Sequence, residues 1–546
     1  MSRVATAAGM PRDTMPVALS FQQVVSRVRR STGWGGRSLA ELLQSPSALV
    51  VGLALTMLLL WGVLSAHFNP SPPADSLEQV LLSQDLRLEY GKHPPMPTWV
   101  LHGVNRLFGA SIGATFILGA LCSVATLLLL YGWAHPLVGA PRAAVATLLA
   151  STVEFMNAGT AYFNHNTVQL PLAMLAIVLF HRALSRLRLF DWVLLGAGAG
   201  LMMLAKFSAL VLFASFAAYL LWTQRVREAP IRRGLAVAAL VFAAVMAPHL
   251  IAVQGDAWAP NRYATAAVFP AEVERLDRLK SVWNFATSHL AKVAPALLIF
   301  AFLRRRAPLA PRPPDARVAL GPFLAIVGFG PLVLTLAAAL IFGARLLVGW
   351  GATFHLLLTL WLVAAYPFAI EAPRRILLRV ALACFAVQLM LWSLMIANGG
   401  RLPNLNRMAS HRAGPAPPPP AHLAEVIQRA WADRSAAPLR YVVADVRTGA
   451  HLAVQLRGRT RVIDGNRPEF EKMFPLDQQA ACGAVLVTAR APLTQAHAAR
   501  HPQLDAQFSA AASVWTAELP LPDGSLRKYF IGIRLPAPGR VCAPAP

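Results

Sequence analysis

Residues 47–66 read SALVVGLALTMLLLWGVLSA, a stretch without a single charged side chain. A helix of this length rises about 30 Å, which matches the hydrocarbon core of a bilayer. Further apolar stretches follow at 111–134, 137–155, 167–184, 191–205, 207–222, 234–253, 288–304, 318–343, 352–370 and 376–397. The whole chain agrees, since 56% of its 546 residues are hydrophobic and only 14% are charged. The sequence therefore predicts a polytopic α-helical membrane protein with about eleven transmembrane helices.

The basic residues predict the direction in which the helices cross, because Lys and Arg stay preferentially on the cytoplasmic side of a membrane. The N-terminal tail, residues 1–46, has four arginines at 27–37 and is therefore expected in the cytoplasm. Counting helices from there places the other arginine-rich loops on the same side, at 182–188, 225–233, 304–317 and 374–375. The first loop, 67–98, and everything after about residue 398 then lie outside. Because this rule accounts for the arginines, the net charge of +25 does not indicate a nucleic-acid partner.

The chain changes composition after the last apolar stretch. The transmembrane domain is expected to span 47–398 and to be followed by a linker, 399–420, which ends in GPAPPPP and should be stiff and extended. Residues 421–546 combine a helical pattern at 422–433 with short β-rich runs, which predicts a small α/β domain outside the membrane; the runs lie at 440–444, 461–463, 484–488 and 529–533. Cys482 and Cys542 lie in this exported region, where an oxidising compartment allows a disulfide.

Ionisable side chains are concentrated directly behind the first helix, between Asp75 and Pro95. Such groups are costly at a membrane surface unless they perform chemistry or bind a charged ligand. Asp75 or Glu78 could act as a general base toward a hydroxyl, while Lys92 and His93 could hold an anionic group. The alternative is an amphipathic surface helix, since leucines recur near helical spacing at 77, 81, 82, 86 and 88. The two interpretations are compatible, because an interfacial helix can begin with a catalytic residue.

Three further places on the outer side collect polar side chains. The stretch Asn164-His165-Asn166 meets the start of an apolar span, where it either caps the helix or contacts a substrate. Lys206 interrupts a long apolar run and either extends toward the headgroups or pairs with a phosphate. Arg345 and His355 flank the start of another span, for which an aromatic belt is the simpler account. Together these sites predict an outer cavity that combines a carboxylate with several cations, which suits a sugar donor carried on a lipid phosphate.

Two parts of the first loop resemble a known signature. Asp75-x-x-Glu78-x-x-x-x-Ser83-Gln84-x-Leu86 and Tyr90-Gly-Lys92-His93-Pro94-Pro95-Met96 are similar to the first-loop motif of bacterial family 39 glycosyltransferases with the GT-C fold. That family includes protein mannosyltransferase-like enzymes, lipid A aminoarabinose transferases and rhizobial lipopolysaccharide galacturonosyltransferases. The stretches 164–172 and 198–209 are similar to its bacterial members as well, so the resemblance covers roughly residues 50–370.

The resemblance implies an integral-membrane glycosyltransferase. Its donor would be a sugar on a polyprenyl-phosphate carrier, expected to be undecaprenyl phosphate. Its acceptor would be lipid A, lipopolysaccharide core, another glycan or a protein at the outer face of the bacterial inner membrane. No nucleotide sugar is required, and GT-C enzymes in general can use a divalent metal, although the sequence has no clear ligand set for one. Asp75 takes the place of the catalytic aspartate, which is the general base of an inverting displacement.

The family pattern implies roles for two other polar residues, and the remaining site residues are our own expectations. His93 and Lys206 match positions near the donor phosphate, to which we add Lys92. The substrate-binding set is expected to comprise Tyr90, Asn164, His165, Asn166, Arg345 and His355. One position departs from the family, which usually has a glutamate directly after its aspartate, because this chain has Ser76. Glu78 is therefore the second candidate for a share of the catalytic role.

Two other functions remain open. A lipid or glycan transporter or flippase would also be polytopic and basic, but it should place ionisable residues near mid-membrane and often has inverted repeats. This chain instead collects such residues at the outer helix ends and carries a soluble domain. The second alternative is a non-catalytic relative within a glycan assembly complex, and Ser76 is the observation in its favour.

Overall fold

The first apolar stretch forms one continuous helical rod in the computed structural model. The rod consists of α3 (Pro46–Met57), the π-helical turn η1 (Leu58–Leu64) and α4 (Ser65–Phe68). Ser45 starts it, because the Ser45 side chain accepts a hydrogen bond from the Ala48 N–H at 3.1 Å and proline follows at the first helical position. A serine cap before proline therefore defines where the membrane domain begins.

The structure describes residues 45–542 apart from a few segments. The undescribed positions within that range are 70, 256–261, 263–264, 267, 270–273, 307–318, 367–372, 399–419, 457, 459 and 522–523. The expected N-terminal tail and the proline-rich linker thus lie almost wholly outside the described residues.

Eight helices in the described part of the chain are long and apolar enough to cross a membrane. The rod at 46–68 is the first, and the others are α7 (Gly113–Val138), α9 (His165–Arg186), α12 (Ala229–Gly255), α14 (Arg275–Arg306), α15 (Leu320–Phe342), η5 with α16 (Val348–His355 and Leu358–Ala365) and α17 (Pro373–Ala397). Three of the expected spans are shorter helices, namely α8 (Ala140–Ser151), α10 (Leu189–Ala205) and α11 (Ala209–Trp222). The expected polytopic helical fold is confirmed.

The helix α8 shows why length matters for these assignments. With 12 residues it is about 18 Å long, which is too short to cross a bilayer alone. Its residues from Ala143 to Ser151 are all buried inside the bundle. The alanine-rich stretch at 137–155 is therefore an internal packing helix rather than a span of full length.

Small residues bring α10 close to α12. An added Cβ on Gly196 would come within 2.4 Å of the Ala238 carbonyl oxygen in α12. One turn later, an added Cβ on Gly200 would meet the Val245 side chain at 2.7 Å. This spacing of small residues is typical of helix pairs in membranes, where close backbone approach replaces a hydrophobic driving force. The contact fixes the position of α10 up to its last residue, after which Lys206 interrupts the helix.

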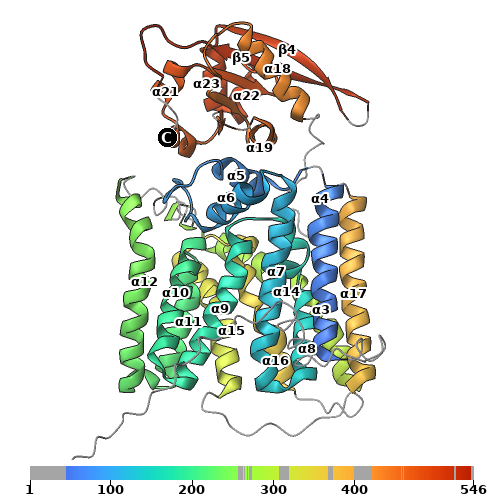
Figure 1. The fold of residues 1–546 in the computed structure, drawn as a ribbon. Coiled ribbons are helices and arrows are strands. Elements are labelled where there is room, and N and C mark those ends of the chain that lie inside the picture. Colours follow the sequence, from blue (N-terminus) through green and yellow to red (C-terminus); the bar gives the residue numbers. More distant parts are fainter. Residues whose placement is uncertain are drawn as a thin grey trace, which may run out of the picture.

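Residues 420–542 form a separate sheet domain on one end of the bundle (Figure 1). Its strand order is β2-β1-β3-β5-β4, in which β1 is parallel to β2 and β3, and β5 is antiparallel to β3 and β4. The strands are β1 (Tyr441–Ala444), β2 (Arg461–Asp464), β3 (Ala484–Thr488), β4 (Ser513–Pro520) and β5 (Leu526–Arg534). The helices are α18 (Pro420–Ala432), α19 (Val446–Gln455), α20 (Pro468–Met473), α21 (Leu476–Cys482), α22 (Gln495–Arg500) and α23 (Pro502–Ser509). A disulfide joins Cys482 to Cys542.

Four of the five strands coincide with the β-rich runs in the sequence, and β4 does not. The strand β4 lies at the edge of the sheet and is largely exposed, so it lacks the buried apolar run that marks the central strands. Its pairing with the longer strand β5 holds it in place. The expected small α/β domain is thus present with one strand more than the sequence indicated.

The first loop lies between the bundle and the sheet domain, as the positions of α5 (Ala74–Leu82) and α6 (Met96–Phe108) show (Figure 1). Leu77 and Leu81 of α5 are 0% and 1% exposed, and they share one apolar core with the sheet domain. Leu86 and Leu88 remain exposed. The helix α5 therefore docks on the sheet domain, whereas the leucine pattern alone had favoured docking on the bilayer.

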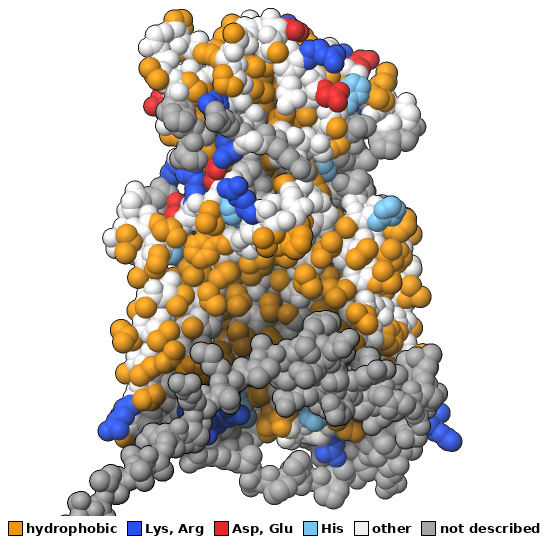
Figure 2. All heavy atoms as spheres, in the orientation of Figure 1, with side chains coloured by type: hydrophobic (Ala, Val, Ile, Leu, Met, Phe, Trp, Pro, Cys, Tyr) orange, Lys and Arg blue, Asp and Glu red, His pale blue; other side chains and the backbone are white. Residues whose placement is uncertain are grey.

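The surface agrees with a membrane protein. Figure 2 shows an apolar surface over the middle of the bundle, with basic side chains at its lower edge. A mixed group of basic and acidic side chains lies where the sheet domain meets the bundle. We call the end of the bundle that faces the sheet domain the domain-facing end, and the candidate site lies there.

Candidate active site

Asp75 lies in the first turn of α5, where the start of α9 holds it. The Asn164 side-chain amide donates a hydrogen bond to Oδ2 of Asp75 at 3.1 Å. The other end of the same amide caps α9, since Oδ1 of Asn164 accepts from the backbone N–H groups of Asn166 and Thr167. The Asn164 side chain therefore caps α9, one of the two roles expected from the sequence, and contacts Asp75 at the same time. The carboxylate of Asp75 is half-buried and has a defined orientation.

Ser76, the departure from the family pattern, has a structural partner. Its hydroxyl oxygen accepts a hydrogen bond from the Phe163 N–H at 2.9 Å, and the side chain is completely buried. A buried N–H without a partner would be costly, so this bond stabilises the contact between the start of α5 and the segment before α9. Serine is thus accommodated as a small buried acceptor beside Asp75.

Lys206 projects from the break between α10 and α11. Its ammonium donates a hydrogen bond to Oδ1 of Asn166 and lies 5.3 Å from the centre of the Trp350 ring. Burial lowers the pKa of Lys206 to about 7, and the charge of Asp75 partly opposes this shift. Lys206 therefore lies close enough to Asp75 for their charges to interact, which extension toward the headgroups alone does not explain.

His93 brings the first loop close to Lys206 and to the start of α9. Its ring lies 4.2 Å from the ring of His165, measured between centroids. Burial lowers the pKa of His93 well below its usual range, and the nearby charges of His165, Lys92 and Lys206 lower it further. His93 is thus a neutral hydrogen-bonding group surrounded by basic side chains, which is an environment suited to an anion. We call the two lysines Lys92 and Lys206, together with the neighbouring side chains of His93, His165 and Asn166, the cation cluster.

Glu78 is held by two cations. The Lys92 ammonium lies 3.3 Å from both carboxylate oxygens of Glu78, and Nη1 of Arg467 donates to Oε1 at 3.1 Å. The carboxylate side chain is only 7% exposed. Arg467 comes from the sheet domain, directly after β2, and its Nε lies 3.3 Å from Asp464. Sequence reasoning missed Arg467, because nothing in the sequence relates the β2–α20 turn to the first loop.

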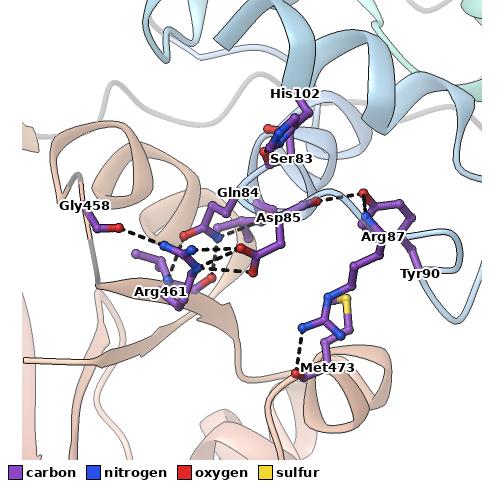
Figure 3. A network of polar contacts seen from close by, with 11 residues as sticks. Ser83, Gln84, Asp85, Arg87, Tyr90, His102, Gly458, Arg461 and Met473 are labelled. Carbon is purple, nitrogen blue, oxygen red and sulfur yellow. Dashed lines mark hydrogen bonds and ion pairs between the residues drawn. The ribbon is translucent and has the colours of Figure 1, made fainter. Parts of the chain in front are cut away.

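Tyr90 organises the loop itself. Its hydroxyl donates to the Asp85 carbonyl oxygen at 2.8 Å and accepts from the Arg87 N–H at 2.9 Å (Figure 3). Burial raises the pKa of Tyr90 to about 12. The ring is 2% exposed, so the structure places Tyr90 as a brace within the loop.

His355 belongs to a second polar group, on the other side of η5. Nε2 of His355 lies 2.7 Å from Nδ1 of His289, and both rings are buried. Lys292, one turn after His289, forms an ion pair with Glu154. Sequence reasoning missed His289 and Lys292, although ionisable residues at the start of an apolar helix are a usable signal.

The helix η5 borders both polar groups, since Trp350 contacts Lys206 and His355 contacts His289. Arg345 lies just before η5 and is exposed, and its backbone N–H binds the Val268 carbonyl oxygen at 2.7 Å. The expected residues are therefore brought to one end of the bundle, except that Arg345 lies on the surface. In the described ranges, no group of three or more His, Cys, Asp or Glu side chains is placed to hold a metal ion.

The structure combines a multi-pass helical bundle, a fixed carboxylate beside a cation cluster at one end of this bundle, and a small sheet domain above that end. Residues 92–251 match the family model for dolichyl-phosphate-mannose-protein mannosyltransferase. This segment includes Lys92, His93, the start of α9 and Lys206. The expected resemblance to family 39 glycosyltransferases of the GT-C fold is therefore confirmed over this segment.

The fold is similar to that of ArnT from Cupriavidus metallidurans. The crystal structure of ArnT bound to undecaprenyl phosphate aligns with a TM-score of 0.61 and 15% identity, covering 90% of this chain and 99% of that chain. The apo structure of ArnT aligns with a TM-score of 0.60 and 14% identity, covering 93% and 100%. No curated protein sequence matches the chain. The similarity therefore extends over the sheet domain as well as the bundle.

Proposed function

We propose that this protein transfers a sugar from a polyprenyl-phosphate carrier to an acceptor at the outer face of the bacterial inner membrane. The observation that carries the proposal is the placement of Asp75, which Asn164 orients beside the cation cluster. A base for the acceptor and cations for the leaving phosphate are the two requirements of this transfer. The undecaprenyl phosphate bound to ArnT supports the same class of carrier.

In the proposed reaction, Asp75 accepts the proton of the acceptor hydroxyl. The hydroxyl oxygen forms a bond to the anomeric carbon of the sugar, and the bond from that carbon to the phosphate oxygen breaks with inversion. The electron pair of the broken bond leaves on the polyprenyl phosphate. Lys206 and Lys92 stabilise this anion, and His93 donates a hydrogen bond to it.

The other residues have supporting roles in the proposal. Asn164 orients Asp75, and Asn166 positions the Lys206 ammonium. His165 packs against His93, while Glu78 positions Lys92 rather than acting as a second base, because it is already paired with two cations. Tyr90, Arg345 and His355 are proposed to shape the substrate cavity from its edges. The N-terminus is proposed to be cytoplasmic and the sheet domain periplasmic.

The test compares cells that express the wild type, Asp75→Asn or Asp277→Asn at equal membrane levels. Asp277 is the matched control, since it is an exposed carboxylate on α14 that pairs with Lys280. Mass spectrometry of glycolipids and glycoproteins should give the same profile for the wild type and for Asp277→Asn. Asp75→Asn should instead give the profile of cells from which the gene is deleted. A general base contributes about 10²–10⁴-fold to rate, so the loss should be nearly complete.

The alternatives give different results in the same experiment. A non-catalytic relative would support the wild-type profile with Asp75→Asn. A transporter or flippase would leave glycosyl transfer by membranes intact and change only the side on which lipid-linked sugar accumulates. Either result would refute the proposed transferase.

A further inference from the structure

The Arg467 side chain of the sheet domain reaches the candidate site. Its Nη1 donates to Oε1 of Glu78 at 3.1 Å, and its Nε pairs with Asp464 of the same domain. The Arg467 charge is close enough to act on both Asp75 and His93. The Arg467 side chain is 27% exposed, while Glu78 is 7% exposed, so the contact is shielded from bulk solvent. A residue of the soluble domain thus contributes directly to the electrostatics of the site.

A second set of contacts docks the same domain on the loop, farther from the site. Figure 3 shows Arg461 of β2 paired with Asp85, at 2.9 Å, and Arg87 donating to the Met473 carbonyl oxygen at 3.1 Å. The side-chain amide of Gln84 also bonds both backbone groups of Val462, as a neighbouring strand would at the edge of the sheet. These contacts follow the C-terminal end of α5, whereas Arg467 contacts the turn nearer Asp75. Docking and site electrostatics can therefore be separated by mutation.

Glu78 lies between Arg467 and Lys92, and this arrangement determines the charge available for a phosphate. A single carboxylate that pairs with one cation cancels most of the field of that cation. Arg467 also pairs with Asp464, so the two cations Lys92 and Arg467 balance the two carboxylates Glu78 and Asp464. Removing Arg467 would leave this group with a net negative charge, and Glu78 would then pair with Lys92 without the opposing pull of Arg467.

We propose that Arg467 is a positioning residue for the donor site: by sharing Glu78 with Lys92, it keeps Lys92 effective toward the donor phosphate, so that the sheet domain completes the active site. This inference rests on the proposed function, because it assumes that the cation cluster binds a lipid phosphate. It assigns the sheet domain a part in donor binding in addition to its structural contact with α5.

The test measures binding of undecaprenyl phosphate to the purified full-length protein in nanodiscs, without turnover. The variants are Arg467→Ala, Arg467→Lys, Arg461→Ala and the double variant Arg467→Ala/Glu78→Gln. Arg461→Ala is the matched control, since Arg461 forms a domain-to-loop ion pair of similar burial with Asp85. Size-exclusion profiles and melting curves establish that each variant is folded.

The expected Kd for Arg467→Ala is about tenfold above that of the wild type, the scale of one weakened charge-assisted hydrogen bond. Arg467→Lys should show a smaller increase, and Arg461→Ala should bind as the wild type does. The double variant should return toward wild-type affinity, because Lys92 is no longer neutralised. A purely structural role would make the double variant no better than Arg467→Ala, which would refute the inference.

Two further outcomes overturn the inference in distinguishable ways. An unchanged Kd for Arg467→Ala, or an equal loss for Arg461→Ala, would refute the role of Arg467 and leave the proposed function intact. A wild type that fails to bind undecaprenyl phosphate would refute the proposed function itself, and the role of Arg467 with it.

Discussion

The burial of Lys206 predicts a specific pH dependence of lipid-phosphate binding. Burial lowers the pKa of Lys206 to about 7, so the ammonium loses its proton as the pH rises through this value. Only the protonated form attracts a phosphate. The protonated fraction falls from about one half at pH 7 to about one eleventh at pH 8, so we expect the Kd of undecaprenyl phosphate to rise roughly fivefold over that interval.

Two other groups, His93 and the lipid phosphate, change their protonation little between pH 7 and pH 8. His93 has a pKa well below its usual range, because it is buried and lies near His165 and Lys92, and it therefore remains neutral throughout. The second ionisation of a phosphate monoester has a pKa near 6 and is almost complete by about pH 7. A change in the Kd of undecaprenyl phosphate between pH 7 and pH 8 therefore reports on the protonation of Lys206.

The assay is a binding titration of the purified protein in nanodiscs at constant ionic strength, from pH 6.5 to 8.5. Lys206→Arg is the control, because a guanidinium stays protonated over the whole range, and its profile should be flat. Lys206→Met should bind weakly at every pH. A wild-type profile as flat as that of Lys206→Arg would refute the assignment of Lys206 as the titrating phosphate ligand.

Three further predictions concern the framework of the site. Ser76→Ala should leave the buried Phe163 N–H unpaired and lower the free energy of unfolding by about 1–3 kcal/mol, which a lower melting temperature in detergent would show. Ser76→Thr is the control, because it keeps the hydroxyl. Equal melting temperatures of the wild type and the alanine variant would contradict the reasoning. Cys482→Ser should destabilise the sheet domain by about 4 kcal/mol, because the disulfide closes a loop with a separation of 60 residues. If this variant resists limited proteolysis as well as the wild type does, the predicted destabilisation is wrong. Reporter fusions should place residue 224 in the cytoplasm and residue 398 outside, and a cytoplasmic location for Lys206 would exclude the site as described.

Several residues of the candidate site could be singled out in the sequence, because the same physical rule marks them. Charged or polar side chains at the ends of apolar helices are costly, so Asp75, Asn164 and Lys206 stood out one by one. The topology counted from the arginines placed all three on one side, and the structure brings them to one end of the bundle. The same rule singled out Arg345, yet its side chain is exposed. The rule identifies residues that are costly to place at a membrane, but it does not say which other residues they contact.

The partner of each side chain was harder to predict. Leucine spacing identified the apolar face of α5, but the same spacing is expected whether this face packs on lipid or on protein. In the structure the apolar face packs on the sheet domain. His289 was overlooked because a lone histidine in an apolar helix has many roles, and only packing places it beside His355. Edge strand β4 was overlooked because an exposed strand lacks a buried pattern.

The sequence by itself determined that this chain is a multi-pass membrane protein with a C-terminal α/β domain and a polar first loop, because transfer of apolar side chains from water and the cost of charge in a bilayer act locally along the chain. Only the tertiary structure decided that Glu78 is shared between Lys92 and Arg467, and that the sheet domain rests on the helix that begins at Asp75. A charge in the sequence requires a partner, but electrostatic attraction does not specify which one, and here one of the two partners of Glu78 lies 389 positions away. The packing of the helical bundle and the sheet domain against the first loop brings Arg467 next to Glu78.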